Sequence, residues 1–140
     1  MKKYISLVIL ILWMIFIFLM SHTSSTSSSN QSGFIVNIIN NILHMNNIEL
    51  LETIIRKLAH LFEYFILGIL MINYLKNYNI KNYILISFAL CLIYSCIDEI
   101  HQLFIPGRNG NIKDVLIDTL GSFIGIIIYK YCKKNIKMIK

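Results

Sequence analysis

Four segments of this chain are long and apolar enough, or nearly so, to cross a membrane as helices. They cover residues 4–20, 58–74, 83–97 and 115–131. A spanning helix needs about 20 predominantly apolar residues, so the third segment reaches membrane thickness only if Asp98 and Glu99 belong to its helix. Because helices and closed barrels alone satisfy their backbone hydrogen bonds in lipid, the pattern predicts an all-α membrane protein with a four-transmembrane-helix bundle.

Composition divides the chain into four parts. They are a first transmembrane anchor at residues 1–20, an outer Ser-rich loop with an extra amphipathic helix at residues 21–48, a core with three transmembrane helices at residues 49–131 and a basic cytoplasmic tail at residues 132–140. The first segment is expected to stay as an anchor, because its apolar run exceeds that of a usual signal peptide and no A-x-A-like cleavage site follows. The amphipathic helix is predicted from apolar positions that recur at helical spacing between Phe34 and Leu43.

The basic residues predict the orientation. If the four spans alternate in direction, nine of the 13 Lys and Arg residues fall on one side, together with none of the seven acids. These nine are Lys2, Lys3, Lys76, Lys81, Lys130, Lys133, Lys134, Lys137 and Lys140. The positive-inside rule makes this side cytoplasmic and places both termini there. Because the lysines only flank spans, the net charge of +6 indicates topology and a lipid bilayer as partner, with no nucleic acid.

Ionisable residues interrupt these apolar segments. A charge in hydrocarbon costs at least ~2.5–3.5 kcal/mol, so such residues are rare unless they are paired or hydrated. Helical spacing places Arg56, His60 and Glu63 on one face of the second span. The same spacing places Asp114 and Asp118 on one face of the fourth span, beside a Gly-x-x-x-Gly pair that permits close helix packing.

The polar residues also match in depth. With a rise of ~1.5 Å per residue from the tyrosines at the cytoplasmic ends, His60, Asp98 and Asp114 come out at about one height. Glu63 and Asp118 come out about one turn deeper. We therefore expect polar groups from three helices to converge in the outer half of the bundle. The residues expected to meet are His60, Glu63, Asp98 and Asp118.

The residues of this cluster are compatible with several chemistries. Carboxylates and imidazoles are common groups in acid–base catalysis, and the catalytic candidates are Glu63, Asp98, Asp118 and His60. The same nitrogen and oxygen groups bind Zn²⁺ or a harder divalent ion, and the metal-ligand candidates are His60, Glu63, Asp98 and His101. No ligand spacing in the sequence is diagnostic of a metal, so the sequence leaves the cofactor open.

Anion binding is a further interpretation. Arginines bind phosphate or carboxylate groups in bidentate fashion, and Arg56 and Arg108 border the expected cluster. The other candidates for substrate or anion binding are His101, Gln102, Glu99 and Asp114. Coupled carboxylates and imidazoles are also typical of proton or ion movement. A last interpretation is a network of ion pairs that only determines how the helices dock.

The core carries three motifs that lie close together in the chain. They are R-K-L-A-H-L-F-E-Y at residues 56–64 with Gly68, D-E-I-H-Q-L-F-I-P-G-R at residues 98–108, and the series Asp114, Asp118, Gly121 and Gly125. In these motifs the chain resembles the VanZ-like family of small bacterial membrane proteins, which is named for a teicoplanin-resistance protein. The resemblance implies a four-helix integral membrane domain of the bacterial cell envelope and, for some members, reduced susceptibility to teicoplanin.

The resemblance also implies a class of ligand. Teicoplanin carries a fatty acyl chain and binds the D-Ala-D-Ala end of cell-wall precursors. We therefore expect an outward-facing polar site that binds a lipid-linked cell-wall intermediate or this lipoglycopeptide. The alternative is a membrane enzyme, an acid–base or metal-assisted hydrolase or transferase that acts on lipid-linked substrates.

Overall fold

Four long helices make up the computed structural model, which describes residues 2–23, 36 and 48–138. They are α1 (Lys2–His22), α3 (Ile48–Asn77), α4 (Tyr83–Gln102) and α5 (Ile112–Met138). Each is long and apolar enough to cross a membrane, and no strand occurs among the described residues. The prediction of an all-α protein with four spanning helices is confirmed. The amphipathic helix expected between Phe34 and Leu43 lies outside the described residues.

The helix ends follow from local sequence. α4 continues through Asp98 and Glu99 to Gln102, which is the condition under which the third segment reaches membrane thickness. The turn between α3 and α4 uses Asn79 and Asn82, both with φ near 55°. Asparagine is one of the few non-glycine residues that adopts this left-handed conformation readily. A short turn of this kind leaves α3 and α4 antiparallel neighbours.

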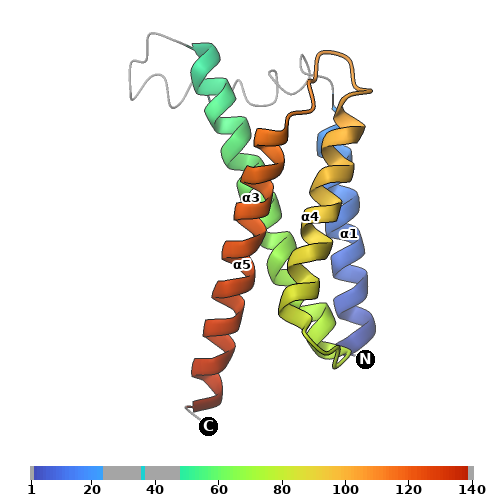
Figure 1. Cartoon of the computed structure of the whole chain (residues 1–140), viewed down its shortest axis with the longest axis vertical. Helices are drawn as coiled ribbons and strands as arrows, with labels where there is room; N and C mark the ends of the chain where they lie inside the picture. The colour runs from blue at the N-terminus through green and yellow to red at the C-terminus, as the bar shows by residue number, and fades with distance from the viewer. Residues whose placement is uncertain (1, 24–35, 37–47, 139–140) are drawn as a thin grey trace.

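The long helix α3 contacts each of the other three helices, as α4 does, and its contact with α5 is the most extensive in the bundle. It crosses α5 closely, while α1 and α4 run side by side (Figure 1). Within the described part of the chain, α1 and α5 do not touch. Both ends of the chain lie at one end of the bundle, and the loop between α4 and α5 lies at the other.

Three glycines allow the close crossing of α3 and α5. A Cβ atom at Gly68 would overlap the Ser122 carbonyl oxygen on the facing helix. The same holds for Gly121 against the Leu61 carbonyl oxygen and for Gly125 against the Phe65 carbonyl oxygen. The Gly-x-x-x-Gly pair is thus used for packing within the chain, as small residues are in many membrane helix pairs.

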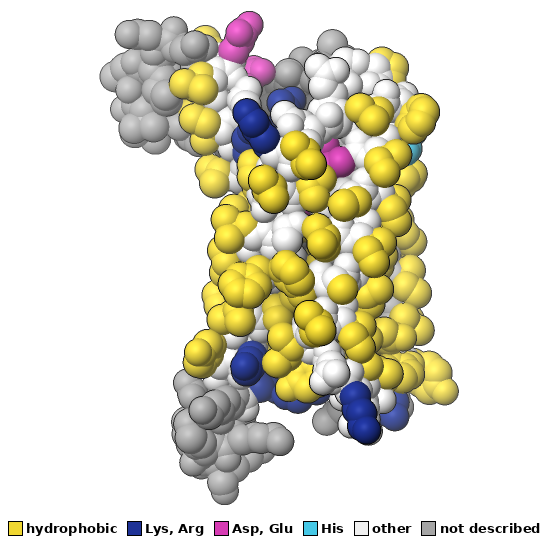
Figure 2. Space-filling view, viewed as in Figure 1, with side chains coloured by type: hydrophobic (Ala, Val, Ile, Leu, Met, Phe, Trp, Pro, Cys, Tyr) yellow, Lys and Arg dark blue, Asp and Glu magenta, His cyan; other side chains and the backbone are white. Residues whose placement is uncertain are grey.

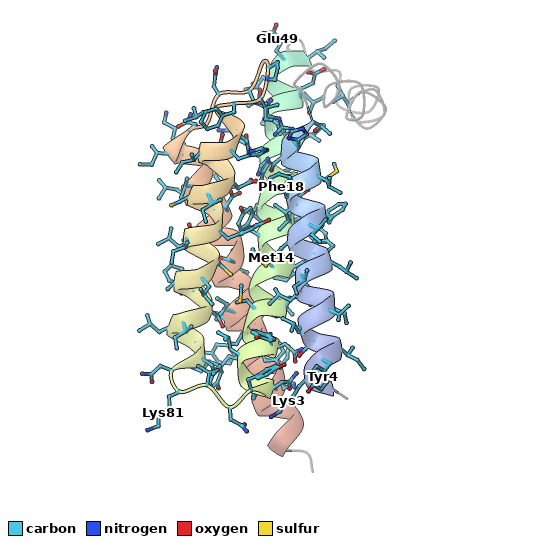
Figure 3. The ribbon with its side chains drawn as sticks, turned by 90° about the vertical axis from the view of Figure 1, so that its right-hand side faces the viewer. Lys3, Tyr4, Met14, Phe18, Glu49 and Lys81 are labelled. Atoms are coloured by element: carbon cyan, nitrogen blue, oxygen red, sulfur yellow. The ribbon has the colours of Figure 1, made fainter. Side chains whose placement is uncertain are left out.

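The surface shows how charge is distributed along the bundle. Apolar side chains form a band around its middle, basic side chains lie at both ends of this band, and acidic groups lie toward one end only (Figure 2). Lys3 and Lys81 lie at the end that carries the termini, and Glu49 lies at the opposite end (Figure 3). The apolar core inside is small and centres on Tyr64 and Leu67 of α3. A bundle with so much exposed apolar surface is suited to lipid.

Candidate functional site

Four ionisable side chains from three helices meet inside the bundle, toward the end opposite the termini. They are His60 of α3, Asp98 and Glu99 of α4, and Asp118 of α5, hereafter the four-residue cluster. One nitrogen or oxygen atom from each lies within 4.8 Å of the corresponding atom of every other member. The structure thus places together three of the residues expected to converge and adds Glu99.

Glu63 lies beside the cluster but is not a member of it. Its carboxyl group is within electrostatic range of His60, Asp98 and Asp118, as expected from its place on the face of α3 that carries His60. The backbone carbonyl of Glu63 also accepts a hydrogen bond of 3.0 Å from the Trp13 indole, which ties α1 to α3 at this level.

The carboxylates of the cluster are buried. Asp118 is 0% exposed and Asp98 is 3% exposed. Two serines donate hydrogen bonds to them: Ser21 Oγ to Asp98 Oδ2 at 2.8 Å, and Ser95 Oγ to Asp118 Oδ2 at 3.0 Å. Neither serine was among the site residues predicted from the sequence. Ser95 could have been found, since it lies one turn before Asp98, whereas Ser21 begins a polar stretch that gives no sign of contact with α4.

Two further donors hold the carboxylates of α4. Gln102 Nε2 lies 3.3 Å from both Asp98 Oδ2 and Glu99 Oε1 and donates to them. The backbone N–H of Asn111, just before α5, donates to Glu99 Oε2 at 2.8 Å. Gln102, expected to bind substrate, therefore positions the acidic groups and also lines the cavity described below.

His60 and Asp118 form the closest ion pair within the cluster. His60 Nδ1 lies 3.5 Å from Asp118 Oδ1, and both atoms are buried with no hydrogen-bond partner among the described residues. The hydroxyl of Tyr64, a fully buried residue one turn further along α3, has no well-formed hydrogen bond there either. Polar atoms buried in this way are uncommon in folded proteins, and a water molecule, an ion or a ligand commonly satisfies them.

A cavity of about 260 Å³ opens next to the cluster, at the end of the bundle away from the termini. Its wall includes five residues that the sequence predicted for a site: Arg56, His60, Gln102, Arg108 and Asp114. Thr53, Lys57, Asn109 and Asn111 also contribute, so most of the lining residues are polar. His60 belongs to both the cavity wall and the cluster, and therefore connects the two.

The basic side chains of the cavity differ in what they contact. Arg108 donates from Nε to the Thr23 carbonyl at 2.9 Å and from a terminal nitrogen to the Met20 carbonyl at 3.3 Å, which satisfies the C-terminal end of α1. Burial, together with the positive charge of Arg56, lowers the pKa of Arg108 from its ordinary value. Lys57 forms an ion pair with Asp114 at 3.4 Å. Arg56 is exposed and makes no hydrogen bond or ion pair with any described residue.

His101 lies apart from the cluster and from the cavity wall. The centroid of its ring lies 4.6 Å from the centroid of the Phe18 ring, and its Nε2 lies 3.1 Å from Nδ1 of His22 at the end of α1. The geometry does not place His101 with His60 as a metal ligand, or beside Arg56 as an anion-binding group, because its ring faces α1. His22 was not selected from the sequence, since it stands at the edge of the Ser-rich stretch.

The fold and the site together define a small four-span membrane protein with a buried acidic cluster beneath a basic cavity at one end. The family model described as VanZ/LLP1 matches residues 6–133 of the chain. The chain therefore belongs to the VanZ/LLP1 family. No curated protein and no solved structure matches it.

Proposed function

We propose that the protein lies in a bacterial cell membrane with both termini in the cytoplasm. Nine of the 13 Lys and Arg residues and none of the seven acids flank the spans on the side of the termini, which supports this orientation, because cytoplasmic loops and tails of membrane proteins are enriched in Lys and Arg. In this orientation the cavity opens at the outer surface, at the level of the lipid headgroups.

We further propose that the cavity binds the anionic end of a lipid-linked cell-wall intermediate, or the lipoglycopeptide teicoplanin. The observation that carries the proposal is Arg56, an arginine on the cavity wall whose charge is paired with no described residue. A guanidinium binds phosphate or carboxylate with two parallel hydrogen bonds, a geometry that lysine lacks. Asn109 and Asn111 on the same wall add amide groups that bind polar headgroup atoms.

The apolar surface beside the cavity supports an acylated ligand. Leu116 and Ile112 of α5 are exposed at the end of the bundle that also carries cavity residues Asp114 and Ile117. An acyl or isoprenoid chain attached to an anion in the cavity would lie along this surface within the bilayer. Both proposed ligands combine a polar head with such a chain.

Expression of the chain in a sensitive bacterium is expected to raise the minimal inhibitory concentration of teicoplanin several-fold. It should leave that of vancomycin, which lacks the acyl chain, unchanged. The Arg56→Gln variant should lose the increase, because it keeps a polar side chain but removes the charge. Lys113→Gln is the matched control, since Lys113 is an exposed cation at the same end that does not line the cavity.

Two results of this experiment would contradict the proposal. One is unchanged sensitivity to both drugs in cells whose membranes contain the intact chain. The other is full resistance in the Arg56→Gln variant. Loss of resistance in the Lys113→Gln variant as well would show that surface charge at this end, and not the cavity, is responsible.

The second candidate function is that of a membrane enzyme acting on lipid-linked substrates. The His60–Asp118 pair favours it, because a carboxylate that orients an imidazole is a common arrangement in general acid–base catalysis. Glu63 and Asp98 lie close enough to take part, and Arg56 would hold the phosphate. Asp98→Asn separates the two candidates: a variant that folds and keeps full resistance argues against catalysis.

A further inference from the structure

The four-residue cluster combines ligand types that are common at metal centres. It offers one imidazole and three carboxylates from α3, α4 and α5, with the ligand atoms no more than 4.8 Å apart. Ligand atoms at about 2.0–2.2 Å from a tetrahedral Zn²⁺ ion lie roughly 3.3–3.6 Å from one another. The largest separation in the cluster would therefore have to shorten by about 1.2–1.5 Å for all four atoms to bind one ion.

Apart from His60, no basic side chain among the described residues balances the charges of the cluster. No Lys or Arg among the described residues makes an ion pair with Asp98, Glu99 or Asp118. The nearby bases are engaged elsewhere: Arg108 binds the end of α1, and Lys57 binds Asp114. Buried carboxylates without a compensating charge are costly, and a bound metal ion is one of the usual ways in which proteins compensate them.

An independent observation is the set of unsatisfied atoms that faces the cluster. Asp118 is fully buried, and its Oδ1 atom lies 3.5 Å from the His60 ring nitrogen and accepts no hydrogen bond from the part of the chain that the structure describes. His60 Nδ1 is likewise buried without a hydrogen bond, so the nitrogen and oxygen atoms that would bind an ion are not used by the protein. Other donors already hold the remaining oxygen of Asp118 and both oxygens of Glu99, an arrangement that orients carboxylates around metals.

We propose that the four-residue cluster binds one divalent cation of the Zn²⁺ or Mn²⁺ type. A set of one nitrogen and three oxygen ligands suits these ions better than Ca²⁺ or Mg²⁺, which prefer oxygen alone. His60 lies on the wall of the cavity, so the cavity provides the path by which an ion enters. This inference does not depend on the proposed ligand, because the four-residue cluster lies inside the bundle, next to the cavity, and does not include Arg56.

The test is metal binding to the purified full-length chain, carrying a tag without histidine and treated with chelator in detergent. Calorimetric titration with Zn²⁺, Mn²⁺ and Mg²⁺ should show about one equivalent bound per chain for Zn²⁺ or Mn²⁺, with Mg²⁺ at least ten-fold weaker. The thermal midpoint should rise when that ion is added, since a ligand that binds only the folded state stabilises it. Elemental analysis of protein purified without chelator gives a second readout of stoichiometry.

Ligand variants provide the decisive comparison. Asp118→Asn and His60→Gln should each weaken binding at least ten-fold, whereas Glu49→Gln, which changes an exposed carboxylate at the same end, should not. Glu99→Gln serves as an additional ligand variant at the end of α4, in case either of the other two fails to fold by circular dichroism. The proposal is overturned if neither Zn²⁺ nor Mn²⁺ binds with defined stoichiometry, or if the folded ligand variants bind as tightly as the wild type.

Discussion

Replacing His60 with leucine is expected to destabilise the protein by about 3–5 kcal/mol, because it leaves the fully buried Asp118 carboxylate without its charged partner. Among the described residues, Ser95 would remain as the one side chain that donates a hydrogen bond to this carboxylate. Removing one member of a buried pair costs far more than the pair itself contributes, since the remaining charge has lost its solvent and its partner. The measurement is the free energy of unfolding in mixed detergent micelles, with increasing denaturing detergent.

Two controls make this prediction specific. The double variant His60→Leu with Asp118→Leu should be more stable than His60→Leu alone, because it removes the orphaned charge. Lys57→Gln should cost no more than about 1 kcal/mol, since its ion pair with Asp114 is partly exposed to solvent. A His60→Leu variant within 1 kcal/mol of the wild type would mean that Asp118 is not charged, or not buried, in the folded protein.

Replacing Gly125 with leucine is expected to prevent α3 and α5 from packing. Even the Cβ of alanine would overlap the Phe65 carbonyl oxygen, and because that atom is backbone, the helices must move apart. Overpacking of this kind typically costs 1–3 kcal/mol, so about this loss is expected for Gly125→Ala and a larger one for Gly125→Leu. The same detergent unfolding experiment measures both losses.

The matched control is Ala89→Leu, which places the same leucine side chain at an exposed position of α4. It should leave stability unchanged, because the new side chain points to lipid or detergent. Wild-type stability of the Gly125→Leu variant would show that α3 and α5 do not cross as closely as described. Instability of both variants would point to a general intolerance of bulk and not to the helix crossing.

The spans and the polar faces could be predicted from the sequence because both depend on periodicity. Apolar runs give the helices, and a spacing of three or four residues gives the face on which His60 and Asp118 lie. A rise of ~1.5 Å per residue then gives the depth of each polar group, and groups on different helices come out at one level. The estimate works because all four helices run roughly across the bilayer. Convergence of the cluster follows from these two simple regularities.

Other features depend on tertiary contacts that no local pattern records. Ser21 belongs to a polar stretch after α1, and only the packing of α1 beside α4 brings its hydroxyl to Asp98. Arg108 was expected to bind an anion because of its charge, but in the fold the carbonyls at the end of α1 accept its hydrogen bonds. His101 faces α1, where its ring lies next to that of His22. Helical spacing alone does not determine which of the neighbouring helices a side chain faces.

The two arginines illustrate how structure refines a prediction made from residue type. Both have the chemistry that binds phosphate, and the sequence gives no reason to separate them. In the fold, Arg108 is half-buried and tied to Thr23, while Arg56 projects at the cavity wall without a partner among the described residues. The proposed anion site therefore depends mainly on Arg56, with Arg108 as a support of the wall.

Thiol labelling in spheroplasts with a membrane-impermeant reagent tests directly whether the cavity faces the outside of the cell and binds the proposed ligand. The background is a chain in which Cys91, Cys96 and Cys132, the three native cysteines, are replaced by serine. Asn109→Cys reports on the cavity wall, Lys113→Cys on the same end outside the cavity, and Lys133→Cys on the opposite end.

We expect rapid labelling of the Asn109→Cys and Lys113→Cys variants in intact spheroplasts, and labelling of the Lys133→Cys variant only after permeabilisation. Teicoplanin or a soluble lipid-linked cell-wall intermediate should slow the labelling of Asn109→Cys several-fold and leave that of Lys113→Cys unchanged. Labelling of the Lys133→Cys variant from outside would contradict the proposed orientation. Labelling of Asn109→Cys that neither ligand slows would contradict the binding of these ligands at the cavity.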